Sequence, residues 1–323
     1  MKKVIKTSLK ILGWIILGIV TLLLLAALLI QTDFVKKKIS SFAEKQANTF
    51  INGELTLGEI GGNFFTGINL EDILISQNGD TLGYIQELKA SYNLLPLIDG
   101  KLDIQSVQVG SPRVFLKQIN DSTWNVQQLI KASTDTTTAN TSSSNFAIDL
   151  AKFRLVDGTI FIDSQDTLIP REINKFAIVF SGAYSADKQS LKMDEFSFNA
   201  RQPDVSVEKL IFTINRDKES IVLKDFELKT AKNQLQGDGD FAEASDPYGN
   251  ANFKTAPIAL SEFQFILPDL QLPARPVFTL EASLRDEKVK AVIQLEAEDQ
   301  KFHFDLVSEN LYIFLFNPEN TEL

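Results

Sequence analysis

The residues that could carry out chemistry are few and form no known catalytic or metal-binding spacing. The single histidine, His303, lies between Phe302 and Phe304 in an alternating segment, where we expect it to share a polar face with Asp305. No triad or metal-ligand pattern surrounds it. The chain has no cysteine, which excludes disulfides, thiolate metal sites and cysteine nucleophiles. We therefore expect a structural or surface role for His303, and no metal or other cofactor.

The acidic residues also lack the spacing of a functional site. The segment Gly237-Asp-Gly-Asp240 resembles part of a calcium loop but lacks the remaining ligands, so a tight turn explains it better. The pairs Glu71-Asp72 and Asp194-Glu195 fall at strand or turn positions and are expected to be solvated. No glycine-rich phosphate loop and no Gly-x-Ser-x-Gly elbow occurs. The sequence therefore predicts a protein that is not an enzyme.

The overall charge excludes another class of function. Lys and Arg number 32 against 42 Asp and Glu, which gives a net charge of −10. A nucleic-acid-binding protein needs a basic face, and this composition supplies none. We therefore expect no nucleic-acid partner.

A recurring spacing of apolar residues, apolar-x-apolar-x-x-apolar-x-apolar, organises most of the chain. Its copies begin at Leu102, Ile148, Leu191, Val205, Ile221 and Ile258. Alternation indicates a strand that keeps one face from water, and the extra residue in the middle reverses the phase as a bulge or kink would. Two copies agree over the longer stretches 102–116 and 148–162. The repetition predicts a stack of similar strands rather than a compact catalytic domain.

From Glu54 onward the sequence predicts a mainly β, elongated structure. Most strands alternate apolar with polar residues and are separated by short turns, which is typical of an antiparallel sheet with one face in water. Helix is expected there only around 123–131. Residues 132–145 are small and polar, and we expect a disordered Ser/Thr-rich loop between a first part of the β-structure at 54–131 and a second at 146–323. Two separately folded domains are the alternative.

Residues 11–30 are predicted to anchor the chain in a membrane. Their uncharged run of twenty residues rises about 30 Å as a helix and matches the hydrocarbon layer. Four lysines precede it without an acid, so residues 1–10 are expected in the cytoplasm and the bulk of the chain across the membrane. A cleaved signal peptide is the alternative, but its apolar region is shorter, about 7–15 residues, and no small-x-small cleavage site follows Ile30.

Residues 31–53 are predicted to contain an amphipathic helix, from Thr32 to Ile51. Its apolar residues fall on one side at helical spacing: Val35, Ile39, Phe42, Ala43, Ala47, Phe50 and Ile51. This side can lie at the membrane surface or close the near end of the strand stack. It can equally pack as an ordinary helix face on the first strands, and the sequence favours neither interpretation.

Together with the anchor and the amphipathic helix, several segments resemble the start of the TamB proteins of the translocation and assembly module, which belong with the AsmA-like group. These segments are Leu55–Ile60, Gly67–Ile75, Gly79–Leu82, Ile104–Leu116 and Asn120–Val126. The Ser/Thr-rich tract before a second copy of the repeat strengthens the resemblance. The resemblance covers most of the chain, in spacing more than in identity.

The resemblance implies a long, curved, antiparallel β-groove with an apolar lumen, anchored by a single pass in the inner membrane of a diderm bacterium with its bulk in the periplasm. Such proteins are implicated in carrying phospholipids toward the outer membrane and in supporting outer-membrane protein assembly and secretion, and they are not enzymes. The implied partners are phospholipid, the inner membrane and an outer-membrane barrel protein. TamB proteins are longer than this chain, so we expect its second part to be truncated at the C-terminus, with a split partner or a short family member as the alternatives.

A lipid conduit would place acyl chains along the alternating apolar residues. The candidate groove residues are Leu102, Ile104, Ile148, Leu150, Phe176, Ile178, Phe180, Phe196, Phe198, Phe226, Leu228, Phe263 and Phe265. The spacing does not decide which half of each kinked strand faces inward. One alternative is a membrane-tethered β scaffold or chaperone that binds client proteins by strand addition, without lipid transport. Another is a closed sheet sandwich with a dry core.

Overall fold

The computed structural model describes residues 32–120, 123–129, 131, 146–242, 247–266, 274–285 and 288–308. Across these residues one α-helix is followed by 17 strands of a single sheet. The predicted span at 11–30 and the Ser/Thr-rich tract at 132–145 lie outside the described residues. Within the part that is described, no helix is both long and apolar enough to cross a membrane.

The N-terminal elements come before the Ser/Thr-rich tract. They are α2 (Asp33–Phe50), β1 (Glu54–Thr56), β2 (Ile60–Gly61), β3 (Gly67–Gln77), β4 (Asp80–Asn93), the 3-10 helix η1 (Leu95–Asp99), β5 (Lys101–Gly110), β6 (Arg113–Asn120), β7 (Thr123–Trp124) and the 3-10 helix η2 (Asn125–Gln128).

The remaining elements follow that tract. They are β8 (Ala147–Asp163), β9 (Glu172–Tyr184), β10 (Gln189–Arg201), β11 (Val205–Arg216), β12 (Ser220–Thr230), β13 (Gln234–Ala242), β14 (Tyr248–Thr255), the 3-10 helix η3 (Leu260–Phe263), β15 (Val277–Arg285), β16 (Lys288–Ala297) and β17 (Gln300–Ser308).

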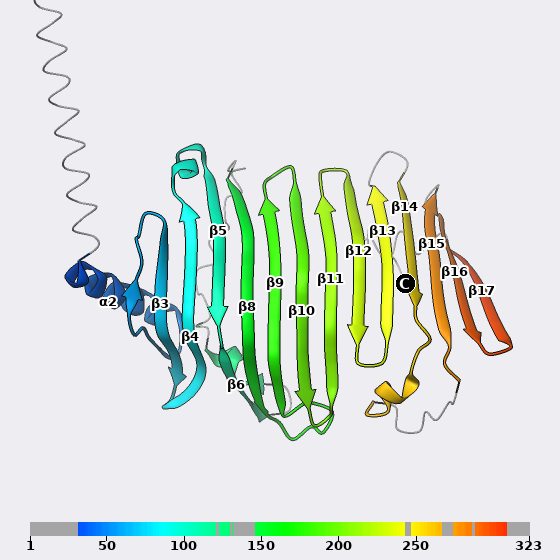
Figure 1. Cartoon of the computed structure of the whole chain (residues 1–323), viewed down its shortest axis with the longest axis horizontal. Coiled ribbons are helices and arrows are strands. Elements are labelled where there is room, and N and C mark those ends of the chain that lie inside the picture. The colour runs from blue at the N-terminus through cyan, green and yellow to red at the C-terminus, as the bar shows by residue number, and fades with distance from the viewer. Residues whose placement is uncertain are drawn as a thin grey trace, which may run out of the picture.

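The sheet follows the order of the chain and is mostly antiparallel. From β8 to β17 each strand pairs antiparallel with the next. Strands β3, β4 and β5 are paired in the same way at the other end. The result is an elongated ribbon of strands with α2 at its N-terminal end (Figure 1). This confirms the mainly β, repeating architecture.

The two long copies of the repeat lie side by side, but in parallel. Strand β5 pairs parallel with β8, Leu102 opposite Ile148 and Ile104 opposite Leu150, and β6 continues the same alignment with Val114 opposite Ile160. The expectation of a purely antiparallel sheet is therefore wrong at this one place. A parallel neighbour requires a crossover of a dozen or more residues, and the chain between β6 and β8 is long enough to make it.

The predicted kinks are β-bulges. They keep the apolar side chains from both halves of a strand on the same face of the sheet. Phe180 and Ile178 of β9 are two residues apart, whereas their partners Met193 and Phe196 on β10 are three apart. The extra residue on β10 restores the phase, so all four side chains share one face of the sheet, which we call the apolar face. The ladder between β12 and β13 shifts in the same way beside Asp225, whose φ is 54°.

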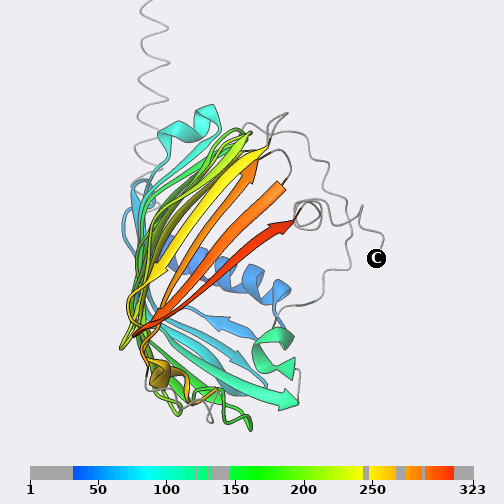
Figure 2. The ribbon, with the colours of Figure 1, turned by 90° about the vertical axis from the view of Figure 1, so that its right-hand side faces the viewer.

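The ribbon is bent across its width. Figure 2, which looks along the ribbon from the β17 end, shows the strands curving around one concave side, with α2 crossing that side at the far end. The long strands and their bulges make this bend, because bulges increase local twist and bending.

Helix α2 (Asp33–Phe50) confirms the helix predicted from Thr32 to Ile51. It is fixed to the sheet through its inner side, where the Glu44 carboxylate accepts a hydrogen bond from the Leu57 amide at 2.7 Å. Asn48 Oδ1 accepts one from the Leu55 amide at 2.7 Å. These bonds give partners to the Leu55 and Leu57 amides, and they hold α2 across the N-terminal end of the sheet.

The predicted single apolar side of α2 is divided in the structure. Residues such as Val35, Ile39 and Ala43 are partly buried, whereas Phe42 and Phe50 are 64% and 69% exposed. The apolar side of α2 that contacts the sheet is therefore narrower than the spacing predicts. The polar side chains of Glu44 and Asn48 make part of the contact, with the chain at Leu55 to Leu57.

Two local predictions differ from the structure, one wholly and one in part. The copy of the repeat at Ile258–Phe265 is not a strand but contains η3, whose turn is closed by hydrogen bonds from the Glu262 amide to Ala259 O and from the Ile266 amide to Phe263 O. Side-chain bonds favour this turn, since the Thr230 hydroxyl donates to the Glu262 carboxylate at 2.5 Å. The helix expected over 123–131 is limited to η2, and Trp124 belongs to β7.

Candidate functional site

The apolar face runs without interruption across most of the sheet. One cross-strand row joins β4 to β17 through paired positions. Its members are Tyr92, Ile104, Leu150, Gly182, Leu191, Ile214, Leu223, Gly239, Ala251, Ala282, Ala291 and Leu306. This row carries no charge, so it forms a continuous uncharged strip across the sheet.

Phenylalanine rings join neighbouring strands on this face. Phe153 of β8 stacks on Phe180 of β9 with ring centroids 4.8 Å apart. Phe196 of β10 meets Phe176 of β9 and Phe198 of its own strand edge-on, at 5.7 Å and 5.9 Å. These distances are those of favourable aromatic pairs. The rings therefore cover parts of β8, β9 and β10 with apolar surface.

The described residues form no second layer over the apolar face. Among the described residues, no large side chain is less than 2% exposed, and most residues of the rows are half-buried. A closed sandwich buries the facing side chains of two sheets. The described residues form one sheet instead, and its apolar face is open.

The opposite face of the sheet is polar and carries ion pairs. Lys209 Nζ lies 2.6 Å from Glu227 Oε2, and this hydrogen bond lowers the pKa of the Glu227 carboxyl below its usual value of 4.5. Lys229 and Glu208 pair at 2.8 Å on the same two strands. His303 Nε2 lies 3.1 Å from Asp305 Oδ1 and is exposed. The prediction that His303 shares a polar face with Asp305 is confirmed.

In the part of the chain that the structure describes, no three His, Asp or Glu side chains lie so that they could hold a metal ion. The Gly237-Asp-Gly-Asp240 segment is not the turn that we expected but the middle of β13, paired with β14. A Cβ at Gly237 would meet the Phe253 ring and the Asn252 carbonyl. Glycine is needed there for close packing rather than for an ion.

Most candidate groove residues fall on this one surface. The pairings align Leu102 with Ile148, Ile104 with Leu150, and Ile178 with Phe196, while Phe176, Phe180, Phe198, Phe226 and Leu228 belong to the same rows or their ring contacts. Some residues of the same surface were missed, among them Phe153, Phe212 and Phe253. Phe153 and Phe212 occupy apolar positions of the repeat, so the repeat itself held the signal for them.

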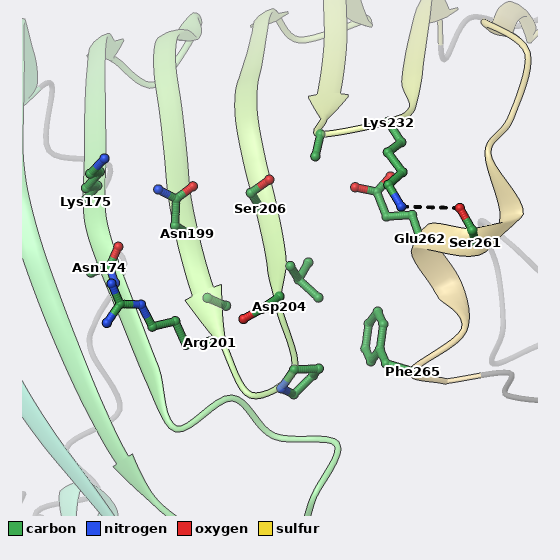
Figure 3. Close-up of a pocket in the computed structure, with 14 residues that line it drawn as sticks. Asn174, Lys175, Asn199, Arg201, Asp204, Ser206, Lys232, Ser261, Glu262 and Phe265 are labelled. Carbon is green, nitrogen blue, oxygen red and sulfur yellow. Dashed lines mark hydrogen bonds between the residues drawn. The ribbon is translucent and has the colours of Figure 1, made fainter.

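Phe263 and Phe265 do not join the apolar face. Phe263 belongs to η3, and Phe265 lines a polar hollow of about 500 Å³ with Asn174, Asn199 and Arg201 (Figure 3). In this hollow Lys232 Nζ lies 3.4 Å from the Ser261 hydroxyl. The two phenylalanines were included because they repeat the apolar spacing, but the strand that this spacing implies does not form.

A comparison with family models decides which family the chain belongs to. A model described as AsmA family matches residues 1–264. The chain belongs to the AsmA family. This membership confirms the resemblance at the level of the wider group and indicates a membrane-associated protein connected with assembly or lipid transport. Neither the curated proteins nor the solved structures gave a match to this AsmA-family chain.

Proposed function

We propose that this AsmA-family protein carries phospholipids along the apolar face of its sheet. The observation that carries the proposal is the uncharged row of paired residues from β4 to β17, which is open rather than packed against a second layer. In this proposal the acyl chains lie on the apolar face, and the headgroups remain toward water.

The physical basis is the transfer of acyl chains out of water. Each CH₂ group that is covered gains about 0.8 kcal/mol, so a chain of ordinary length binds favourably anywhere along the row. Because no charged side chain interrupts the row, none opposes the movement of an acyl chain from one position to the next. An uncharged, repetitive strip therefore suits passage better than storage at one site.

We further propose the TamB-like setting for this activity. The chain is anchored in the inner membrane through residues 11–30, with its N-terminus in the cytoplasm and its bulk in the periplasm, and it passes lipid toward the outer membrane. An outer-membrane barrel protein is the proposed partner at the far end. The protein acts without catalysis, and residues 146–323 form the second part of one groove.

A charge placed on the apolar face tests the proposal. Phe196→Asp puts a carboxylate between the Phe176 and Phe198 rings, where it repels acyl chains. The full chain is purified from membranes, and the phospholipid that accompanies it is counted by mass spectrometry. We expect the lipid per chain to fall by roughly half or more, because a carboxylate that acyl chains cover without a partner costs several kcal/mol.

The matched control is Ser197→Asp. Ser197 is the next residue along β10, lies on the other face of the sheet and is paired with Ala177 of β9. This variant should leave the amount of lipid unchanged. Equal loss in both variants, or equal retention in both, would contradict the proposal. Client proteins recovered in place of lipid would favour the scaffold alternative.

A further inference from the structure

Three hydrogen-bonding side chains lie at the edge of the apolar face, at one end of the strands. Tyr184 of β9 is paired with Gln189 of β10, and Gln189 is paired with Arg216 of β11. Adjacent strands are separated by about 4.8 Å, so the three side chains leave the sheet from neighbouring positions on the same face. All three can donate hydrogen bonds. We call this set the polar row.

The row directly inside the polar row is apolar. The same three strands contribute Gly182, Leu191 and Ile214, which are paired with one another. With the polar row and flanking apolar residues they line a single hollow of about 440 Å³. This volume lies in the range of small-ligand sites. The hollow therefore has an apolar floor and one polar edge, which is the division found in an amphiphile.

Arg216 is the only charged residue that the strand pairings place on the apolar face, counted over the described residues of β8 to β17. Its side chain is exposed. A lone cation at the edge of an otherwise uncharged surface can bind an anion without competition from a neighbouring acid on that surface.

The nearby acids are already engaged elsewhere. The Asp217 carboxylate accepts hydrogen bonds from the Glu219 amide at 3.0 Å and from the Ser220 amide at 2.7 Å, and these bonds lower its pKa. Asp149, which lines an adjoining hollow with Arg216, pairs with Lys101 at 2.9 Å. Both carboxylates are therefore committed to partners other than Arg216.

We propose that Tyr184, Gln189 and Arg216 bind the phosphate of an anionic phospholipid headgroup while its acyl chains lie on the apolar rows. Arginine suits this task because its planar guanidinium donates two parallel hydrogen bonds to phosphate oxygens. The proposal rests on the proposed function and adds to it a headgroup class and a fixed position. Lipids with an anionic headgroup would pause at this end of β9 to β11, whereas uncharged positions farther along would not distinguish headgroups.

A photo-crosslinking amino acid at Ile214, in the floor of the hollow, tests the proposal. The full chain is reconstituted in vesicles of equal parts phosphatidylglycerol and phosphatidylcholine, and the crosslinked lipid is identified by mass spectrometry. We expect phosphatidylglycerol to be captured about tenfold more than phosphatidylcholine, because both lipids carry the phosphate but the choline cation of phosphatidylcholine offsets the attraction of Arg216 for it. Arg216→Gln should reduce the ratio to near one without lowering total capture.

Arg154→Gln is the matched control, because it removes an arginine from the opposite face, where Arg154 is paired with Val179. It should leave the ratio unchanged. A ratio that Arg216→Gln does not alter would overturn the headgroup proposal while lipid capture continued to support the proposed function. Displacement of phosphatidylglycerol by millimolar glycerol 3-phosphate, with phosphatidylcholine still captured, would identify a site for soluble phosphate esters and would also overturn it. If no lipid is captured at Ile214 or at Ile178, the proposed function itself fails.

Discussion

Phe153 of β8 and Phe180 of β9 stack with their ring centroids 4.8 Å apart, and both rings belong to the apolar face. The register between the two strands slips by one residue on one side of this pair, between Leu150 and Phe153. The bulge is therefore placed where it brings two large rings into contact. The pair joins the repeat that contains β8 to the long antiparallel series that follows.

This stacking predicts that the two rings stabilise the sheet jointly. Phe153→Ala and Phe180→Ala should each lower the free energy of unfolding, and the double variant should lose less than the sum. The coupling energy should be about 0.5–1.5 kcal/mol, the range of aromatic pairs. Urea denaturation of the full chain in detergent, followed by circular dichroism, measures it. Strict additivity would show that the rings do not interact.

The bulge beside Phe226 predicts a second effect, on backbone conformation. Asp225 has a φ of 54°, which β-branched residues adopt only with strain. Asp225→Val should therefore lower the free energy of unfolding by about 1–2 kcal/mol, whereas Asp225→Gly should be nearly neutral. The midpoint of urea unfolding distinguishes them. Similar midpoints for the two variants would mean that the left-handed conformation does not matter for stability.

The ion pair on the polar face predicts a pH dependence. Hydrogen bonding by Lys209 lowers the folded-state pKa of Glu227 below 4.5, so its contribution to stability is present above pH 4.5 and is lost as the pH falls through the lowered pKa. Glu227→Gln should lower the free energy of unfolding at pH 7 by less than about 1 kcal/mol, because the pair is partly exposed. As the pH falls through this lowered pKa, the variant and the natural chain should converge. A gap that persists or widens in acid would contradict this assignment.

We predict that the outer side of α2, the side that faces away from the sheet, contacts a lipid surface. Phe34 is 72% and Phe42 64% exposed, and the helix residues around them include the exposed cations Lys37, Lys38 and Lys45. Lys38 Nζ lies 5.9 Å from the Phe34 ring. Exposed aromatic rings with interspersed lysines are typical of helices that lie in the interface of anionic membranes.

The absence of cysteine makes this contact easy to measure. A polarity-sensitive dye on Phe42→Cys should shift to the blue in vesicles that contain anionic lipid, and less in neutral vesicles. The same dye on Glu219→Cys, in an exposed turn, serves as the control and should not shift. Equal spectra at the two sites would place the outer side of α2 in water.

The sequence predicted those features that repeat along the chain. The alternation around Leu191 to Phe198 was sufficient to predict strands with a bulge, and the apolar positions of α2 were sufficient to predict the helix. The agreement of 102–116 with 148–162 predicted a repeat, but not that the copies pair in parallel. Parallel pairing depends on where the intervening crossover returns, and no local spacing contains that information.

Features that depend on distant partners could not be predicted in this way. Phe263 occupies the same position in the apolar repeat as Phe226. A turn nevertheless forms there, where the Thr230 hydroxyl of β12 bonds to the neighbouring Glu262 carboxylate. The polar row was also hidden, because Tyr184 and Arg216 are far apart in sequence and only the register places both beside Gln189.

The most direct test of the account is a photo-crosslinking scan along β10, one residue at a time from 191 to 198, with the full chain in phospholipid vesicles. We predict strong lipid capture at Leu191, Met193, Phe196 and Phe198 and weak capture at the positions between them. The interval of three residues across the bulge would appear as a phase shift in this pattern. Capture that is uniform along the strand, or strongest at residues 192, 194, 195 and 197, would contradict a lipid-carrying apolar face.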